Sequence, residues 1–149
     1  MSREPEPLPP LLGALMRMPI DALQRRMLDE ARAAGYTDLV QAHFAVMRYP
    51  GPDGRRPSDI AAEVDMTKQA MNYLLGQLEQ LGYLIREDDP VDGRSKRVRM
   101  TARGNALRQT IRSTVTRIER ELEDELGSAD YRQLRDLLVR LNRAEALAG

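Results

Sequence analysis

The sequence contains no cysteine and no tryptophan, and it has one histidine and one phenylalanine among 149 residues. Without cysteine, the chain cannot form a disulfide, use a thiolate nucleophile or build a cysteine zinc site. Its single histidine, His43, cannot build a usual zinc site, and no acids cluster at ligand spacing. The sequence also lacks a phosphate-binding glycine loop, a nucleophile elbow and a recognisable histidine-based triad. We therefore expect no enzyme, no metal and no cofactor.

Long apolar runs and a net charge are missing as well. No stretch approaches 18 uninterrupted apolar residues, and the first ten residues hold acids and four prolines, so we expect neither a membrane span nor a signal peptide and predict a cytoplasmic protein. The 23 cations balance 23 acids, but eight cations and no acid lie between residues 93 and 118. A local basic patch of this kind favours a polyanionic partner.

Apolar spacing predicts mostly helices with one β-hairpin. Pro19 should kink or divide the first helix, Ser58 is the expected N-cap of the third, and Thr67 and Thr101 open later ones. The strands are expected at residues 83–87 and 96–100, and Gly127 separates the last two helices. The predicted helices span residues 11–34, 38–48, 58–64, 67–81 and 101–126, and a last helix begins at residue 128.

A short helix, a three-residue turn, a longer helix and a hairpin form the plan of a winged helix-turn-helix, so the predicted fold is mainly α with a small β-hairpin wing (α+β). The outer helices carry apolar stripes that a chain this small cannot easily cover, which predicts a homodimer. The expected organisation is a disordered segment at 1–10, an N-terminal dimerisation helix region at 11–35, a winged helix-turn-helix lobe at 38–100 and C-terminal dimerisation helices at 101–149.

These residues resemble the multiple antibiotic resistance regulator (MarR) family. Asp89-Pro90, Asp92-Gly93-Arg94 and the segment 98–104 resemble its pattern D-P-x-D-x-R followed by V-x-L-T-x-x-G, and residues 59–84 fit its helix-turn-helix. The sequence departs from many relatives at 66–73 and in its shortage of aromatic residues. The resemblance implies a dimeric regulator that binds a pseudo-palindromic site in double-stranded DNA, acts as a repressor and is released by a small anionic or phenolic effector.

The resemblance implies that Arg94 at the wing tip enters the minor groove, with Asp92 fixing the arginine side chain. At the start of the second helix-turn-helix helix, Gln and Asn side chains can pair with adenine in the major groove. The expected DNA-binding residues are Thr67, Lys68, Gln69, Asn72, Tyr73, Asp92, Arg94, Lys96 and Arg97. His43 and Met47 are candidate effector contacts.

Each of these interpretations has an alternative. The polar side chains after Thr67 can be an exposed helix face opposite a leucine stripe, and the charged hairpin can be a solvated turn. His43 can serve core or interface packing, and Arg55 and Arg56 can touch the DNA backbone or lie in a solvated loop. The whole chain can be a winged-helix module for protein interaction, although the basic run after Gly93 disfavours that reading.

Overall fold

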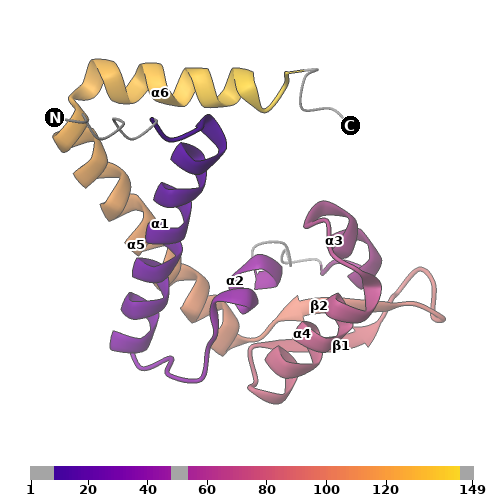
Figure 1. Ribbon diagram of the computed structural model, residues 1–149. Helices are drawn as coiled ribbons and strands as arrows, with labels where there is room; N and C mark the ends of the chain where they lie inside the picture. The colour runs from indigo at the N-terminus through magenta and orange to yellow at the C-terminus, as the bar shows by residue number, and fades with distance from the viewer. Residues whose placement is uncertain (1–8, 48–53, 145–149) are drawn as a thin grey trace, which may run out of the picture. The chain divides into compact units, whose positions relative to one another are not determined.

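The computed structural model describes residues 9–47 and 54–144. The chain divides into two compact units, Met1–Ile111 and Arg112–Gly149, and each is described by itself. Within the described residues, the fold is mainly helical with one two-stranded antiparallel sheet (Figure 1). The elements are α1 (Leu12–Ala33), α2 (Gln41–Met47), α3 (Pro57–Glu63), α4 (Lys68–Gln80), β1 (Leu84–Asp88), β2 (Lys96–Met100), α5 (Ala102–Leu126) and α6 (Ser128–Leu141).

The order α3, turn, α4 and hairpin is the predicted winged helix-turn-helix, and it lies within the first unit. Thr67 is the N-cap of α4, as predicted, because its Oγ1 accepts a hydrogen bond from the Ala70 N–H at 3.2 Å. The prediction of Ser58 as the N-cap of α3 is wrong. Arg56 holds that position and Pro57 is the first helical residue, where its fixed φ suits the helix and its missing N–H removes no hydrogen bond.

Of the two outcomes predicted for Pro19, division of the first helix is wrong, because α1 runs from Leu12 to Ala33, and a kink stays a prediction. The start of α2 also differs from the prediction. Helix α2 starts at Gln41 instead of Asp38, because Leu39 is buried in the core and the Asp38 carboxylate binds other elements. The predicted end of α2 at Arg48, the turn over residues 50–53 and the start of the chain before residue 9 lie outside the described residues.

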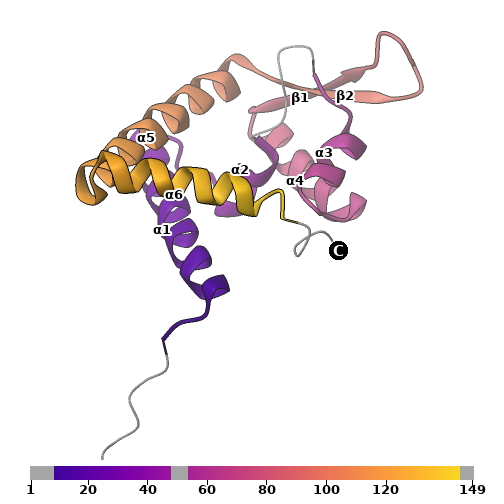
Figure 2. The same cartoon turned by 90° about the horizontal axis from the view of Figure 1, so that it is seen from above.

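The hairpin has a fixed register in which Leu84 pairs with Met100 and Asp88 pairs with Lys96. Leu84, Val98 and Met100 are buried, so one face of the hairpin packs on the core. A segment that the sequence did not predict joins the sheet: the Arg55 N–H donates to the Val98 carbonyl at 3.0 Å, and the Val98 N–H donates back at 2.7 Å. In Figure 2 the loop between β1 and β2 extends beyond the ends of α3 and α4.

The core of the first unit combines residues from α1, α2, α3, α4, the hairpin and the start of α5. The apolar stripe expected on the helix after Thr67 is part of this core, and its residues Met71, Leu74 and Leu78 are at most 8% exposed. The remaining members of this cluster are Ala31, Leu39, Phe44, Val46, Met47, Ile60, Ala61, Leu75, Tyr83, Leu84, Val98, Met100 and Leu107. A polar face on α4 therefore lies opposite a fully packed apolar one.

The start of α5 is tied to the end of α4 by backbone contacts. The Thr101 hydroxyl donates to the Gly82 carbonyl at 2.6 Å and accepts from the Gly104 N–H at 3.1 Å, which confirms Thr101 as a helix cap. The Thr101 N–H donates to the Tyr83 carbonyl at 3.0 Å. A Cβ on Gly104 would lie 2.1 Å from that same carbonyl oxygen, so only glycine allows this approach.

Arg103 and Asp38 complete this junction around Tyr83. The Tyr83 hydroxyl donates to Asp38 Oδ1 at 2.6 Å, and the Arg103 guanidinium binds Asp38 Oδ2 at 2.9 Å while it stacks 4.3 Å from the centre of the Tyr83 ring. Burial, followed by the bond to the Asp38 carboxylate, raises the pKa of Tyr83. These contacts join the segment before α2, the start of β1 and the start of α5.

The second unit contains the remainder of α5 and all of α6, which begins after Gly127. Apolar side chains on both helices are exposed in the single chain, and the sequence predicted these stripes. The exposed members are Leu122, Leu126, Leu134, Leu137, Leu138 and Val139. Among the described residues, no helix combines the length and apolar character needed to cross a membrane.

Changing Gly104 to Ala should destabilise the fold by about 1–3 kcal/mol, because the new methyl group meets a backbone oxygen that cannot move aside as a side chain can. Urea unfolding should show the loss as a lower midpoint. Gly93→Ala is the matched control, since a Cβ there meets no atom within 4 Å. Equal midpoints for the wild type and Gly104→Ala would contradict the close packing at Tyr83.

Candidate nucleic-acid interface

The first turn of α4 presents polar side chains and no acid. Lys68 and Gln69 are exposed, and the side chain of Lys68 has no ion-pair partner among the described residues. The free N–H groups and the positive dipole end of a helix N-terminus favour anions. One turn later, Asn72 is half-buried and Tyr73 is 66% exposed. The structure thus brings Thr67, Lys68, Gln69, Asn72 and Tyr73 onto one end and one side of α4.

Arg86 of β1 holds α4 against the wing. Its guanidinium donates to the Asn72 carbonyl at 3.1 Å and lies 3.4 Å from Glu79 Oε2. The Arg86 N–H also donates to Glu79 Oε1 at 3.2 Å. Because these contacts reach both the middle and the end of α4, they fix the helix relative to the hairpin.

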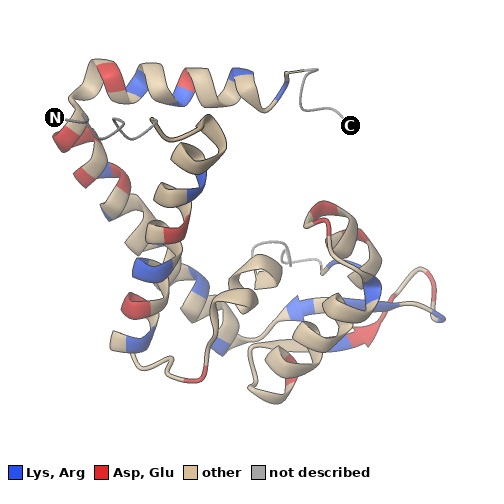
Figure 3. Ribbon diagram, in the orientation of Figure 1, with Lys and Arg blue, Asp and Glu red and all other residues tan. Residues whose placement is uncertain are grey.

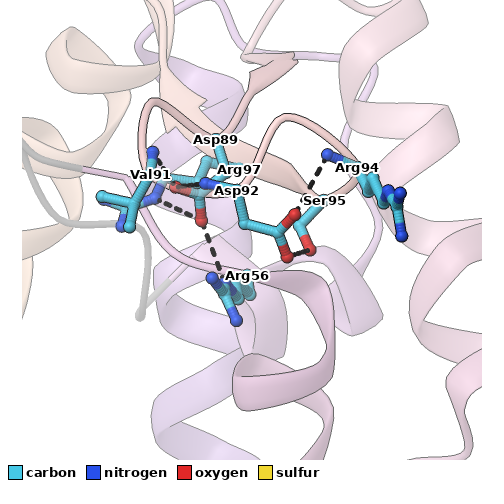
Figure 4. Close-up of polar contacts among 7 residues, drawn as sticks. All are labelled: Arg56, Asp89, Val91, Asp92, Arg94, Ser95 and Arg97. Atoms are coloured by element: carbon cyan, nitrogen blue, oxygen red, sulfur yellow. Dashed lines mark hydrogen bonds and ion pairs between the residues drawn. The ribbon is translucent and has the colours of Figure 1, made fainter.

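The wing loop is built around the buried carboxylate of Asp89 (Figure 4). This side chain has no exposed surface, yet it accepts from the Val91 N–H at 2.9 Å and from Arg56 Nε at 3.0 Å, and it pairs with Arg97 Nε at 3.0 Å. The Val91 N–H, followed by the Arg97 and Arg56 guanidinium groups, holds the pKa of Asp89 far below its usual range. Asp89 is therefore ionised and joins the loop to α3 and β2.

Asp92 shapes the turn that carries Arg94, but it does so through the backbone. Its Oδ1 accepts from the Arg94 N–H at 3.1 Å, and its Oδ2 accepts from the Ser95 hydroxyl at 2.8 Å. The Ser95 hydroxyl and then the Arg94 N–H lower the pKa of Asp92. The prediction that Asp92 holds the Arg94 side chain is wrong, because its oxygens are committed to these two nearer donors. The Arg94 guanidinium is exposed and has no partner among the described residues.

The other cations of the hairpin are paired with acids, and Figure 3 shows basic and acidic positions next to each other on the two strands. Lys96 lies 2.6 Å from Asp88, and Arg99 lies 2.7 Å from Glu87. Arg97 is bound to Asp89 and is largely covered. Of the four predicted DNA-binding cations, Lys96 and Arg97 are thus held by acids in the free chain, whereas Lys68 and Arg94 are not.

The sequence did not reveal the roles of Arg55 and Arg56. Arg55 forms the extra β-bridge to Val98, and its side chain pairs with Glu63. Arg56 caps α3 and binds the buried Asp89, 33 residues further along the chain. Only the charge of Arg56 beside Pro57 was visible in the sequence, and it does not indicate such a distant partner.

The predicted effector residues His43 and Met47 are 2% exposed, and both lie in the core of the first unit. A cavity of about 620 Å³ lies nearby between α1 and α2, but neither residue lines it. Its lining consists of Ile20, Leu23, Gln24, Met27, Gln41, Ala42, Phe44, Ala45 and Val64. Gln24 and Gln41 are hydrogen-bonded to each other and are the polar groups of this otherwise apolar lining. An effector role for His43 and Met47 stays a prediction.

Changing Asp89 to Asn should lower the free energy of unfolding at neutral pH, because the amide leaves two arginines without their carboxylate. Since folding lowers the pKa of Asp89, its stabilisation is present above the unfolded pKa and is lost as the pH falls below about 4. The difference between wild type and variant, measured by urea unfolding, should therefore shrink at acidic pH. Asp88→Asn, at an exposed ion pair, should change stability little at any pH. If the difference in unfolding free energy between the wild type and Asp89→Asn does not change with pH, the result would contradict an ionised Asp89 that pairs with the two arginines.

The winged lobe is similar to known proteins in sequence and in fold. The MarR family model matches residues 38–95, which cover α2, the helix-turn-helix, β1 and the wing loop. The chain is 30% identical over 88 residues to the HTH-type transcriptional repressor Rv2887 of Mycobacterium tuberculosis and equally to the repressor Mb2911 of Mycobacterium bovis. The match spans 59% of this chain and 63% of each relative.

The fold is also that of solved regulators. The repressor CouR bound to a 23-mer DNA duplex aligns with a TM-score of 0.71 and 24% identity, over 89% of this chain and 92% of that chain. The S. aureus MepR–DNA complex aligns with a TM-score of 0.74 and 21% identity, over 91% of this chain and 98% of that chain. The winged lobe of this chain is therefore similar in sequence to the MarR family over residues 38–95, and the chain shares its winged helix-turn-helix fold with these solved structures.

Proposed function

We propose that this chain is a dimeric, non-enzymatic transcriptional regulator that binds a pseudo-palindromic site in double-stranded DNA and represses transcription until a small effector releases it. The similarity of residues 38–95 to the MarR family supports the general class, and the similar proteins named above include repressors and structures bound to DNA. The proposal for this chain rests on the arrangement of its own charges.

The observation that carries the proposal is the pattern of paired and unpaired cations. Lys68 at the start of α4 and Arg94 in the wing loop have no acidic partner among the described residues, whereas Lys96, Arg97 and Arg99 do. A paired cation must break its ion pair to bind phosphate, but an unpaired one needs only to be desolvated. The two unpaired cations lie on the helix and the loop that a winged helix presents to the major and minor grooves.

The remaining predicted residues give these two elements distinct roles. Gln69 and Asn72 can read the edge of adenine in the major groove, where an amide matches N6 and N7. Arg94 can enter the narrow minor groove, where the negative potential is strongest, while the turn fixed by Asp92 limits the backbone freedom lost on binding. Thr67 caps α4 and leaves its first N–H groups directed toward phosphate.

In the proposed homodimer, the second copy supplies the other half of the DNA-binding surface. Apolar side chains at the start of α1 and along α5 and α6 remain exposed in the single chain, which favours their burial against a second copy. In a two-fold dimer the recognition helices enter successive major grooves about 34 Å apart, which matches half-sites one helical turn apart. Dimerisation therefore sets the spacing of the DNA site.

The cavity between α1 and α2 is the proposed effector site. Its volume of about 620 Å³ is in the range of small-molecule sites, and its lining is apolar apart from two glutamine amides. Such a lining suits a small phenolic compound better than an anionic one, since it holds no cation; the ring would contact Phe44 and Met27 while the hydroxyl reaches Gln24 or Gln41. Its position against α2 places it beside the winged lobe.

The test is selection of duplexes from a random pool, followed by titration of the selected and a random duplex at several salt concentrations. Arg94→Ala should weaken binding by about 1–3 kcal/mol per contacted subunit, lower the salt dependence and relax any preference for A·T-rich flanks. The guanidinium has no partner among the residues that the structure describes, so thermal stability should not change.

Arg99→Ala is the matched control, because it removes the same charge from the same hairpin at a residue already paired with Glu87. It should weaken binding clearly less than Arg94→Ala does. Equal losses for the two variants would show that only total charge matters. If the wild type fails to bind any duplex, DNA binding is refuted and a role in protein interaction is favoured.

The proposed dimer can be tested by sedimentation at micromolar concentration. The wild type should sediment at twice the chain mass of 16.9 kDa, and Leu137→Asp should shift it toward monomer, because a carboxylate cannot be buried without a partner. Val91→Asp changes an equally apolar and more exposed residue in the wing loop and should leave the dimer intact. A monomeric wild type would refute the proposed assembly.

A further inference from the structure

The single histidine lies on α2, which packs against α4, and both of its ring nitrogens are hydrogen-bonded. His43 Nδ1 lies 3.2 Å from the backbone nitrogen of Val40. The Val40 N–H can only donate, so Nδ1 accepts and carries no proton. The ring is therefore neutral with its proton on Nε2, and at 2% exposure water does not compete for either nitrogen.

This tautomer determines the orientation of a glutamine on α4. His43 Nε2 lies 3.1 Å from Gln77 Oε1, so the Nε2–H donates and the amide oxygen accepts. The amide nitrogen of Gln77 is then directed the other way, and it donates to the Tyr73 hydroxyl at 3.0 Å. A continuous chain of donors thus runs from the Val40 N–H through His43 and Gln77 to Tyr73.

The end of this chain leaves Tyr73 with one free hydrogen. Because the hydroxyl oxygen already accepts from Gln77, its own O–H must point elsewhere, and the side chain is 66% exposed. Gln69, Tyr73 and Gln77 are spaced by four residues, so they form one row along α4. The outward O–H therefore lies in the same row as Gln69, at the helix end proposed to enter the major groove.

We propose that His43 and Gln77 are positioning residues that hold the Tyr73 hydroxyl as a hydrogen-bond donor to an acceptor atom of DNA, either a phosphate oxygen or the acceptor edge of a base. This inference rests on the proposed DNA binding and adds to it the polarity of one contact. A tyrosine hydroxyl alone can donate or accept. Here the buried imidazole removes that ambiguity before DNA arrives, which reduces the orientational cost of binding.

The contact is tested by Tyr73→Phe, which removes the hydroxyl and keeps the ring. Affinity for the selected duplex should fall about tenfold, as expected for a hydrogen bond of moderate strength. If the acceptor is a phosphate oxygen, a random duplex loses affinity by the same factor. If the acceptor is a base edge, the random duplex loses much less. Either result supports an outward donor and identifies its acceptor.

The positioning role is tested by Gln77→Met, which keeps the length of the side chain and removes both the acceptor of the His43 Nε2–H and the donor to Tyr73. It should weaken binding about threefold alone but hardly at all in the Tyr73→Phe background, because the glutamine acts only through the tyrosine hydroxyl. Gln80→Met is the matched control on the same helix, since its exposed side chain forms no hydrogen bond among the described residues. It should not change affinity.

A second variant inverts the polarity. In Gln77→Glu the carboxylate can still accept from His43 but can no longer donate, so the Tyr73 O–H turns inward to it. The loss of affinity should exceed that of Gln77→Met, and the excess should become smaller when Tyr73 is already Phe. Any extra loss of affinity that Gln77→Glu still causes in the Tyr73→Phe variant is due to the added negative charge near DNA, and not to the direction of the hydroxyl hydrogen.

The tautomer of His43 can be measured directly in the free protein, because the nitrogen NMR spectrum of the ring distinguishes the Nε2–H from the Nδ1–H form. The Nε2–H form is expected at neutral pH. An Nδ1–H ring, or additive effects of Gln77→Met and Tyr73→Phe, would overturn the inference while wild-type DNA binding stands. If no duplex binds the wild type, the proposed function itself fails and the DNA contact fails with it.

Discussion

The burial of the Asp89 carboxylate is the constraint on which the wing depends. A buried charge is tolerated only when it is paired and hydrogen-bonded, and the partners of Asp89 come from three places: Arg56 before α3, Arg97 on β2 and the Val91 N–H in the loop. Satisfying one carboxylate therefore brings the helix-turn-helix, the hairpin and the loop together. The turn that carries Arg94 follows directly from this anchored position, which explains why a surface proposed to bind DNA begins with an acid.

The same logic explains how a chain without net charge can present a basic surface. Most cations of the hairpin are bound to acids on the neighbouring strand or in the loop, so they stabilise the wing and contribute little free charge. Lys68 and Arg94, which have no acidic partner among the described residues, lie at the start of α4 and at the wing tip. If this surface binds DNA as proposed, recognition depends on the placement of a few groups more than on net charge.

Local pattern predicted the helices, the hairpin and the core positions of α4, because apolar periodicity and the caps at Thr67 and Thr101 act over a few residues. Contacts between distant segments were not predicted, and some local assignments were wrong. The link from Arg56 to Asp89 spans 33 residues and that from His43 to Gln77 spans 34, and no local pattern indicates either one. The carboxylate of Asp92 was assigned to the wrong donor because nearby backbone N–H and hydroxyl groups satisfy it first. The start of α3 is set by Pro57, whose fixed φ suits the first helical position, and the predicted cap at Ser58 lies two residues after the actual one at Arg56.

Helix α2 connects the proposed effector site to the proposed DNA contact. Ala42, Phe44 and Ala45 line the cavity on one side of this helix, while His43 reaches Gln77 on the other at 3.1 Å. A hydrogen bond at that distance weakens when its atoms separate by a few tenths of an ångström, so a small displacement of α2 is enough to release the orientation of Tyr73. An effector shifts α2 only if it binds the displaced position more tightly than the DNA-bound one, and DNA must then lower effector affinity by the same factor. The arrangement therefore links the two sites through one short helix and one amide, without requiring the helix-turn-helix to unfold.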